Sequence, residues 1–145
     1  MRFFFDENVS PRVIQPVQQI YLAHVFESIH DRRWSTLRGT DDDDLLERVA
    51  ASFDVFVTAD ERQLRDHADA LRASRLHWIS LRSPRQGGLS GLSMTSATLL
   101  AALPLFLNET ERTSPCWAKF KGVPNQAQQR MTLIEPATGR ERRTA

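Results

Sequence analysis

Three aspartates that border apolar segments could together bind a metal ion. Asp6 directly follows the apolar segment 2–5, and Asp60 lies two residues after the apolar segment 55–58. Asp42 belongs to a run of four aspartates that precedes an amphipathic helical pattern. Carboxylate oxygens without a histidine or cysteine cluster favour Mg²⁺ or Mn²⁺ over Zn²⁺. Such an ion lowers the pKa of a bound water molecule and orients it towards a phosphodiester.

Each of these aspartates, taken alone, also fits an ordinary structural role. Aspartates at the start of a helix accept hydrogen bonds from free backbone N–H groups and complement the helix dipole. An aspartate after a strand is often only a turn residue. Three carboxylates in one place would repel one another unless a cation lay between them. Their conjunction therefore favours a metal site over three separate roles.

Apolar segments alternate with helical patterns along the chain and predict an α/β domain. The expected strands are residues 2–5, 23–26, 55–58 and 76–81, with closing strands at 117–121 and 131–135 around a polar turn. Helices are expected from residue 11 and over 41–52, 61–73 and 95–107, with irregular segments at 28–40 and 83–94. This alternation predicts a three-layer α/β/α fold with a mostly parallel central sheet. We expect one domain over residues 1–136 and a basic, disordered tail over 137–145.

The predicted fold brings the three aspartates to one edge of the sheet. Parallel α/β sheets bind their ligands beyond the carboxyl ends of the strands, where Asp6 and Asp60 are expected. A crossover helix runs antiparallel to its strands, so its N-terminus returns to the same edge. At about 100° per residue, Asp42 lies nearest the apolar stripe of its helix, while Asp43 and Asp44 point increasingly away. We therefore expect Asp42 to be the inward-facing member of the run.

Charge and cysteine content bear on the location and partners of the protein. The 145 residues carry a net charge of +1, which by itself does not identify a nucleic-acid partner. Cys116 is the only cysteine, which excludes an intramolecular disulfide and a thiolate metal cluster. The most apolar stretch, 97–107, is shorter than the roughly 20 residues needed to cross a bilayer, and the first residues show no signal-peptide pattern. We expect a cytoplasmic protein with no membrane segment.

The segments that contain the three aspartates resemble the successive sequence blocks of PIN-like domains. The matching blocks are residues 1–11 (MRFFFDENVSP), 39–46 (GTDDDDLL) and 57–60 (VTAD). PIN-like domains include the VapC-type ribonuclease toxins and short bacterial relatives. The resemblance implies a Rossmann-like sheet and Mg²⁺- or Mn²⁺-dependent cleavage of RNA. It further implies the toxin of a type II toxin–antitoxin pair, which forms a homodimer and binds a cognate antitoxin.

The resemblance also assigns roles to individual residues of this chain. Asp6, Asp42 and Asp60 match the catalytic, metal-binding acids of the family. Thr58 matches the small hydroxyl residue that supports the last acid. Asn8, in the same block as Asp6, is expected to support the site as well.

Two departures from the family pattern concern a second metal ion. Arg62 stands where many relatives have a further acid, and Asp42 has a shorter side chain than the glutamate of many PIN domains. Asp69 could supply a fourth acid, as in some relatives, although a straight helix would point it away from the apolar face. Arg62 and Arg65 would contact RNA phosphates, unless they only form a solvated helix face.

Two other functions remain open for the same residues. One is a non-catalytic PIN-like module that binds RNA or a protein, which Arg62 favours. The other is a phosphate-accepting, receiver-like domain, which also has acids after its first and third strands. Such a domain needs a lysine at the end of a particular later strand, and the sequence around Lys119 and Lys121 is not typical of that strand end.

The segment 97–107 is apolar nearly all round, more than a helix on one face of a sheet requires. We therefore expect part of it to be buried in a homodimer or against an antitoxin, because large apolar patches seldom stay exposed. Complete burial in the core of the monomer is the alternative.

Overall fold

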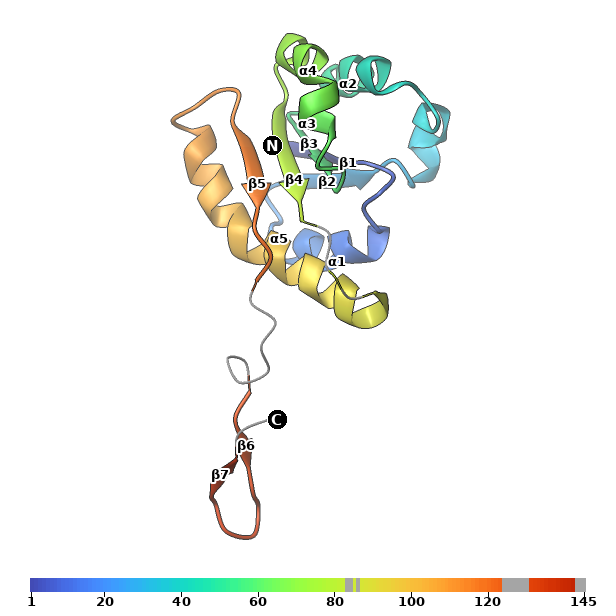
Figure 1. Ribbon diagram of the computed structural model, residues 1–145. Coiled ribbons are helices and arrows are strands. Elements are labelled where there is room, and N and C mark those ends of the chain that lie inside the picture. Colours follow the sequence, from blue (N-terminus) through green and yellow to red (C-terminus); the bar gives the residue numbers. More distant parts are fainter. Residues whose placement is uncertain (83–84, 86, 124–130, 143–145) are drawn as a thin grey trace.

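A five-stranded parallel sheet forms the centre of the computed structural model, which describes residues 1–82, 85, 87–123 and 131–142 (Figure 1). The strands are β1 (Arg2–Phe5), β2 (Val25–Ser28), β3 (Val55–Thr58), β4 (His77–Leu81) and β5 (Trp117–Phe120). Their order is β2-β1-β3-β4-β5, and each neighbouring pair runs parallel. The predicted α/β fold with a mostly parallel sheet is confirmed.

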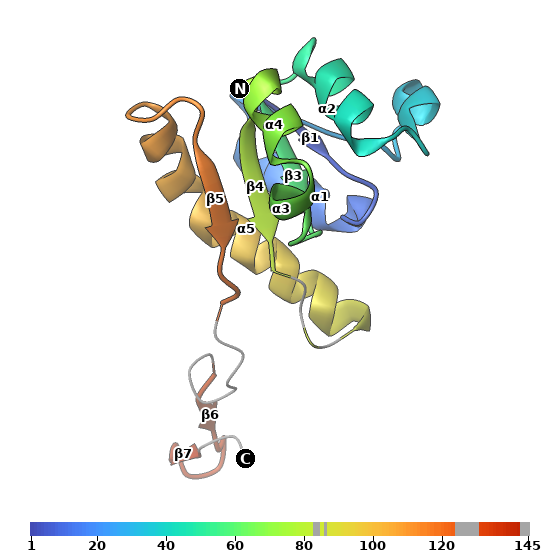
Figure 2. The ribbon, with the colours of Figure 1, turned by 45° about the horizontal axis from the view of Figure 1, so that its top comes forward.

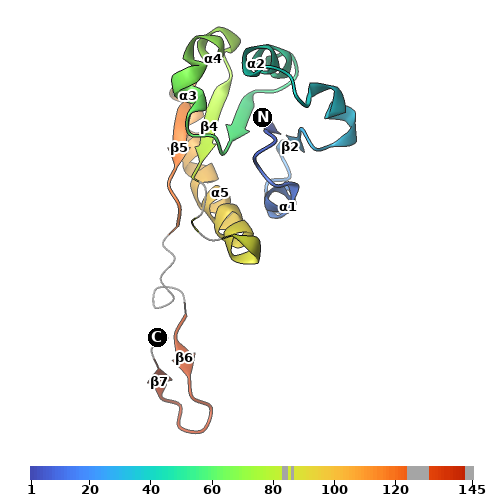
Figure 3. The ribbon, with the colours of Figure 1, turned by 45° about the vertical axis from the view of Figure 1, so that its right-hand side comes forward.

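Helices cover both faces of this sheet and complete the three layers (Figures 2 and 3). They are α1 (Pro11–Ile20), the 3-10 helix η1 (Arg32–Leu37), α2 (Asp42–Ala50), α3 (Gln63–Asp66), α4 (Ala68–Ser74) and α5 (Gly88–Thr110). Helices α1 and α5 pack together on one face, and α2 and α4 pack together on the other. The sheet is therefore buried on both sides, as its apolar strands require.

The first strand shows how one short sequence serves both faces. Phe3 and Phe5 lie in the core cluster that includes α1 and α5, whereas Phe4 lies in the cluster that includes α2. Successive side chains of a strand point to opposite faces, so three consecutive phenylalanines bury both layers. All three are completely buried. This anchoring fixes the position of Asp6, the next residue along the chain.

The second strand lies two residues further along the chain than predicted, at Val25–Ser28 instead of 23–26. The predicted strand ended one residue before Glu27. Glu27 is in fact buried and forms ion pairs with Arg2 and Arg33. The following segment, predicted to be irregular, contains the 3-10 helix η1.

The helix predicted over 61–73 is two short helices, α3 and α4. The break is at His67, whose backbone angles (φ −128°, ψ 28°) leave the helical region. The chain changes direction there, and the His67 ring is placed against the start of α2. The misprediction thus has a consequence for the site.

Helix α5 begins at Gly88, earlier than the predicted residue 95, and spans 23 residues. Residues 83, 84 and 86 of the predicted loop lie outside the described part of the chain. The first turns of α5 pack across α1, where the Ser96 hydroxyl donates a hydrogen bond of 3.1 Å to the Val13 carbonyl. This packing outweighs the weak helix propensity of the glycines and serines there.

Helix α5 is also long and apolar enough, by those two criteria alone, to cross a membrane. Core helices of soluble proteins meet the same criteria. Leu99, Leu103 and Phe106 of α5 are buried in the cluster that covers the sheet. The helix therefore serves as a layer of the domain.

The two closing strands predicted around a polar turn belong to different sheets. β5 pairs in parallel with β4, because the chain crosses over through α5 and returns in the same direction. β6 (Leu133–Ile134) instead pairs antiparallel with β7 (Glu141–Arg142), in a hairpin that Figure 1 shows away from the sheet. Two residues of the segment predicted to be disordered thus form a strand. Most of the predicted polar turn falls on 124–130, outside the described residues.

Candidate active site

The three aspartates singled out above come from three elements that meet at the carboxyl edge of the sheet. β1 and β3 are neighbours in parallel register, with Phe5 opposite Val57. Asp6 directly follows β1, and Asp60 follows β3 by two residues. Asp42 is the first residue of α2, which packs on the adjoining face. The fold thus delivers one carboxylate from each of three distant segments to this region.

Asp6 is the buried member of the group, with 7% of its surface exposed. Its Oδ1 accepts a hydrogen bond from the Glu7 amide (2.8 Å), and its Oδ2 accepts one from the Thr58 hydroxyl (3.2 Å). Burial raises the pKa of the Asp6 carboxyl, and the negative charges of Asp42 and Glu7 add to this effect, while the two hydrogen bonds oppose it. Asp6 and Asp42 therefore lie close enough to repel each other.

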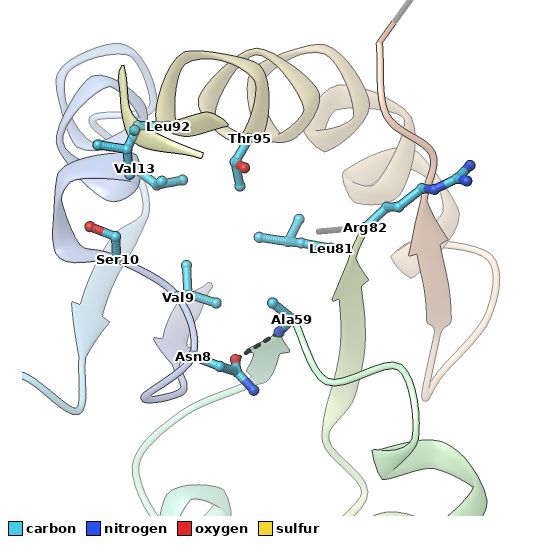
Figure 4. A pocket seen from close by; sticks show the side chains of 10 residues that line it. Asn8, Val9, Ser10, Val13, Ala59, Leu81, Arg82, Leu92 and Thr95 are labelled. Carbon is cyan, nitrogen blue, oxygen red and sulfur yellow. Dashed lines mark hydrogen bonds between the residues drawn. The ribbon is translucent and has the colours of Figure 1, made fainter. Parts of the chain in front are cut away.

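Thr58 and Asn8 connect the loop after β1 to the loop after β3. The Asn8 Nδ2 donates to the Thr58 hydroxyl (3.2 Å), and the Asn8 Oδ1 accepts from the Ala59 amide (2.8 Å; Figure 4). The Thr58 oxygen also accepts from the Asp60 amide (3.0 Å). One buried hydroxyl thus touches Asp6, Asn8 and the backbone of Asp60. Thr58 therefore contacts the Asp6 carboxylate and the Asp60 amide directly, whereas Asn8 is linked to them through Thr58 and Ala59.

Asp42 is half-buried, whereas the other three aspartates of the run are exposed. Its Oδ2 lies 3.0 Å from Nε2 of His67. Asp41 is the N-cap residue of α2, but its side chain makes no capping hydrogen bond. The hydrogen bond that would be expected if the run served as a helix cap is thus not formed by Asp41. The inward position expected for Asp42 agrees with this arrangement.

His67 was not recognised in the sequence, because it stood in a segment predicted to be one continuous helix. Its Nδ1 lies 2.7 Å from Oδ1 of Asp43, which was expected to point away. Burial lowers the pKa of His67, but the hydrogen bond to Asp43 and the charges of Asp42, Asp43 and Asp41 outweigh it, and the pKa is raised. The doubly protonated ring can donate to both carboxylates at once. No spacing in the sequence pairs residue 67 with residue 42; only the fold does.

Arg62 pairs with the third aspartate. The Asp60 Oδ1 accepts from the Arg62 amide (2.9 Å) and lies 3.4 Å from the Arg62 Nε. The Arg62 side chain is 72% exposed, so this ion pair is solvated. Arg65 instead pairs with Asp66 at 2.7 Å, also in solvent. Of the two arginines expected to meet phosphate, Arg62 therefore touches the acid group.

Asp69 does not join the other aspartates in this structure. Its side chain is fully exposed on α4 and pairs with Arg72, one helical turn away. A straight helix was expected to point Asp69 away from the apolar face, and in the structure its side chain does point into solvent. A fourth carboxylate from this helix is absent from the described arrangement around Asp6.

The donor set suits a hard divalent cation. Carboxylate oxygens are the ligands that Mg²⁺ and Mn²⁺ prefer, and a cation would relieve the repulsion between buried Asp6 and Asp42. As the side chains stand, no three His, Cys, Asp or Glu groups among the described residues surround one position. The reason is that Asp42 faces His67 and Asp60 faces Arg62. The chemistry of the donors fits, and both carboxylates must turn from their present partners to join Asp6 around an ion.

Comparison with known protein families agrees with the observed fold. A family model described as "PIN like domain" matches residues 1–83, which include all three aspartates as well as Asn8 and Thr58. No curated protein and no solved structure was found to match the chain. PIN-like domains are generally nucleases, and they typically use divalent metal ions. The chain belongs to the PIN-like domain family.

Proposed function

We propose that this protein is a Mg²⁺- or Mn²⁺-dependent ribonuclease whose metal ligands are Asp6, Asp42 and Asp60. The observation that carries the proposal is the buried Asp6 carboxylate. It is hydrogen-bonded through Thr58 towards Asp60 and lies within electrostatic reach of Asp42. A structural role alone does not explain why a carboxylate is buried beside other acids without a basic partner of its own. Metal binding does, because a divalent cation supplies that partner.

The side chains around the acids have separate tasks in this proposal. Thr58 and Asn8 hold the two loops at a fixed spacing, so that Asp6 and Asp60 are positioned before substrate arrives. Arg62, released when Asp60 takes up its ligand role, is near enough to contact an RNA phosphate. A metal ion bound there would lower the pKa of a coordinated water molecule. Its positive charge would also stabilise the negative charge that develops on the phosphate.

We further propose that the protein is the toxin of a type II toxin–antitoxin pair and forms a homodimer or binds an antitoxin through α5 and β5. A groove of about 630 Å³ lies between these two elements. Leu105 of α5 lines it and is 68% exposed. β5 is an edge strand of the sheet, with one side not paired in the five-stranded order. An exposed apolar groove along a free strand edge supports a partner at this place.

The test of the nuclease proposal is cleavage of RNA by purified protein in Mn²⁺, in Mg²⁺ and in EDTA. The proposal predicts cleavage that requires a divalent ion, and the Asp69→Asn variant should cut as the wild type does. Its carboxylate is exposed and paired with Arg72, away from the acids. Cleavage that persists in EDTA, or its absence in both metals, would contradict the proposal.

A non-catalytic PIN-like module that binds RNA is the second candidate. The observation in its favour is that Asp42 and Asp60 are paired with His67 and Arg62, so no three ligand groups converge as they stand. This candidate predicts RNA binding that divalent ions do not strengthen, and no cleavage. The same assay, read together with an RNA-binding titration, separates the two functions.

A further inference from the structure

A second feature of this edge is a cavity of about 360 Å³ beside the acids (Figure 4). It lies where α1 and α5 begin, beyond the ends of β3 and β4. Val9, Val13, Leu81 and Leu92 form much of its wall. Figure 4 shows these side chains and Thr95 surrounding the hollow. The volume lies within the range of about 300–1,000 Å³ typical of small-ligand sites.

The cavity shares part of its wall with the candidate active site. Asn8 and Ala59 line it, and the Asn8 Oδ1 accepts the Ala59 amide proton at 2.8 Å. On its other side, the Asn8 carboxamide is bonded to the Thr58 hydroxyl, which contacts Asp6. Only Asn8 and the Thr58 hydroxyl thus lie between a molecule in the cavity and the buried Asp6 carboxylate.

The lining of the cavity does not suit a small free ion of either charge. Among the described residues that line it, Arg82 is the only charged one, and its guanidinium extends away from the hollow in Figure 4. The Ser10 oxygen accepts from the Arg12 amide, and the Thr95 hydroxyl donates to the Gly91 carbonyl. The remaining walls are largely aliphatic. Such a site favours a flat group with apolar faces and a few polar edge atoms.

We propose that this cavity receives one nucleobase of single-stranded RNA, from the nucleotide next to the phosphate held at the acids. The proposal rests on the proposed function, because the divalent cation that the acids would bind is what would hold that phosphate. A nucleobase has two apolar faces, and its edge atoms can hydrogen-bond to the lining hydroxyls: the Ser10 hydroxyl can still donate its proton, and the Thr95 oxygen can still accept one. The base must leave any stack to enter, so single strands are favoured over duplexes.

The test is a scan of fluorescently labelled single-stranded RNAs in which one nucleotide at a time lacks its base. Binding to wild-type protein is measured by fluorescence polarisation in Ca²⁺, and strand length is checked on a gel afterwards. The scan is repeated with Leu92→Trp, which fills the cavity. Leu89→Trp is the matched control, since Leu89 lies on the same helix, does not line the cavity and is 70% exposed.

The proposal predicts that one position of the scan loses about tenfold in affinity with the wild type, the scale of a single base contact. That loss should disappear in Leu92→Trp, whose affinity for the intact strand is already lowered, and should persist in Leu89→Trp. A flat scan with the wild type would overturn the nucleobase site. It would do so even if Leu92→Trp failed to fold. Metal-dependent cleavage with a flat scan would leave the proposed nuclease standing, whereas a position-specific scan without cleavage would refute the nuclease and support the base site.

Discussion

At the scale of single residues, the site balances buried and exposed charges. Among the residues that the structure describes, Asp6 has no basic partner, and its pKa is raised by burial, whereas Asp42 and Asp60 are paired with His67 and Arg62. Two of the three proposed ligands therefore already contact a basic side chain of the protein. Binding of a metal ion would exchange these contacts for metal–oxygen bonds, and each side chain can be tested for its part in that exchange.

The four neighbouring aspartates allow a test within one segment. Asp42→Asn should lower RNA cleavage by about a hundredfold or more, because it removes a proposed ligand. Asp44→Asn is the control, since Asp44 is exposed and forms no ion pair with another described residue, unlike Asp42 and Asp43. It should cut at the wild-type rate. Equal rates in the two variants would remove Asp42 from the site.

Asp6→Asn should raise the thermal midpoint of the metal-free protein. The raised pKa means that the folded state binds a proton more tightly than the unfolded state does. Stability is therefore lost as pH rises through the folded-state pKa, and above that pKa the ionised carboxylate carries the full cost of its burial. Removing the charge should shift the midpoint in EDTA upwards by about 2–4 °C. A midpoint that falls in this variant would mean that Asp6 serves the fold more than the site.

His67 should make stability depend on pH in the opposite sense from an ordinary carboxylate. Its pKa is raised above the ordinary histidine value of 6.5, so its stabilisation is complete below that value and is lost as pH rises through the folded-state pKa. The wild type should therefore exceed His67→Gln in stability by at most about 1 kcal/mol at pH 6, and by less at pH 8. Denaturation in EDTA at both pH values measures the difference. A constant difference would show that the ring is not held by its charge.

At the scale of elements, two short features place the site, and they differ in how clearly the sequence shows them. The apolar strands β1 and β3 could be predicted because their residues are buried on both faces. The break between α3 and α4 could not, because His67 leaves the helical region only to meet aspartates that are distant in sequence. The early start of α5 was missed for a related reason, since packing on α1 overrides its glycines and serines.

Helix α5 offers a prediction that separates core from interface. Leu103 is completely buried, and Leu103→Ala should cost about 2–5 kcal/mol of stability. Leu105 is exposed in the groove beside β5, and Leu105→Ala should change monomer stability by no more than about 0.5 kcal/mol. The same change should weaken a dimer or an antitoxin complex, as measured by sedimentation. Unchanged assembly in Leu105→Ala would exclude this groove as the interface.

At the scale of the whole molecule, the parallel sheet explains why three weak signals in the sequence could be combined. Parallel strands place Asp6 and Asp60 at one edge, and the crossover returns Asp42 there. Helical periodicity predicted an inward-facing Asp42 and an outward-facing Asp43, whereas both side chains contact the His67 ring. The present partners of the acids, His67 and Arg62, depend on side-chain contacts that periodicity does not specify. The pairing of β5 with β4 likewise depends on the crossover through α5.

The proposed function requires above all that the three aspartates bind a divalent cation. Calorimetric titration with Mn²⁺ measures this binding directly. Wild-type protein should bind Mn²⁺, and Asp6→Asn should lose that binding while remaining folded, because the buried carboxylate is the ligand without another partner. Asp69→Asn should bind as the wild type does. A wild type that takes up no Mn²⁺, or an Asp6→Asn variant that binds it equally well, would contradict the central claim.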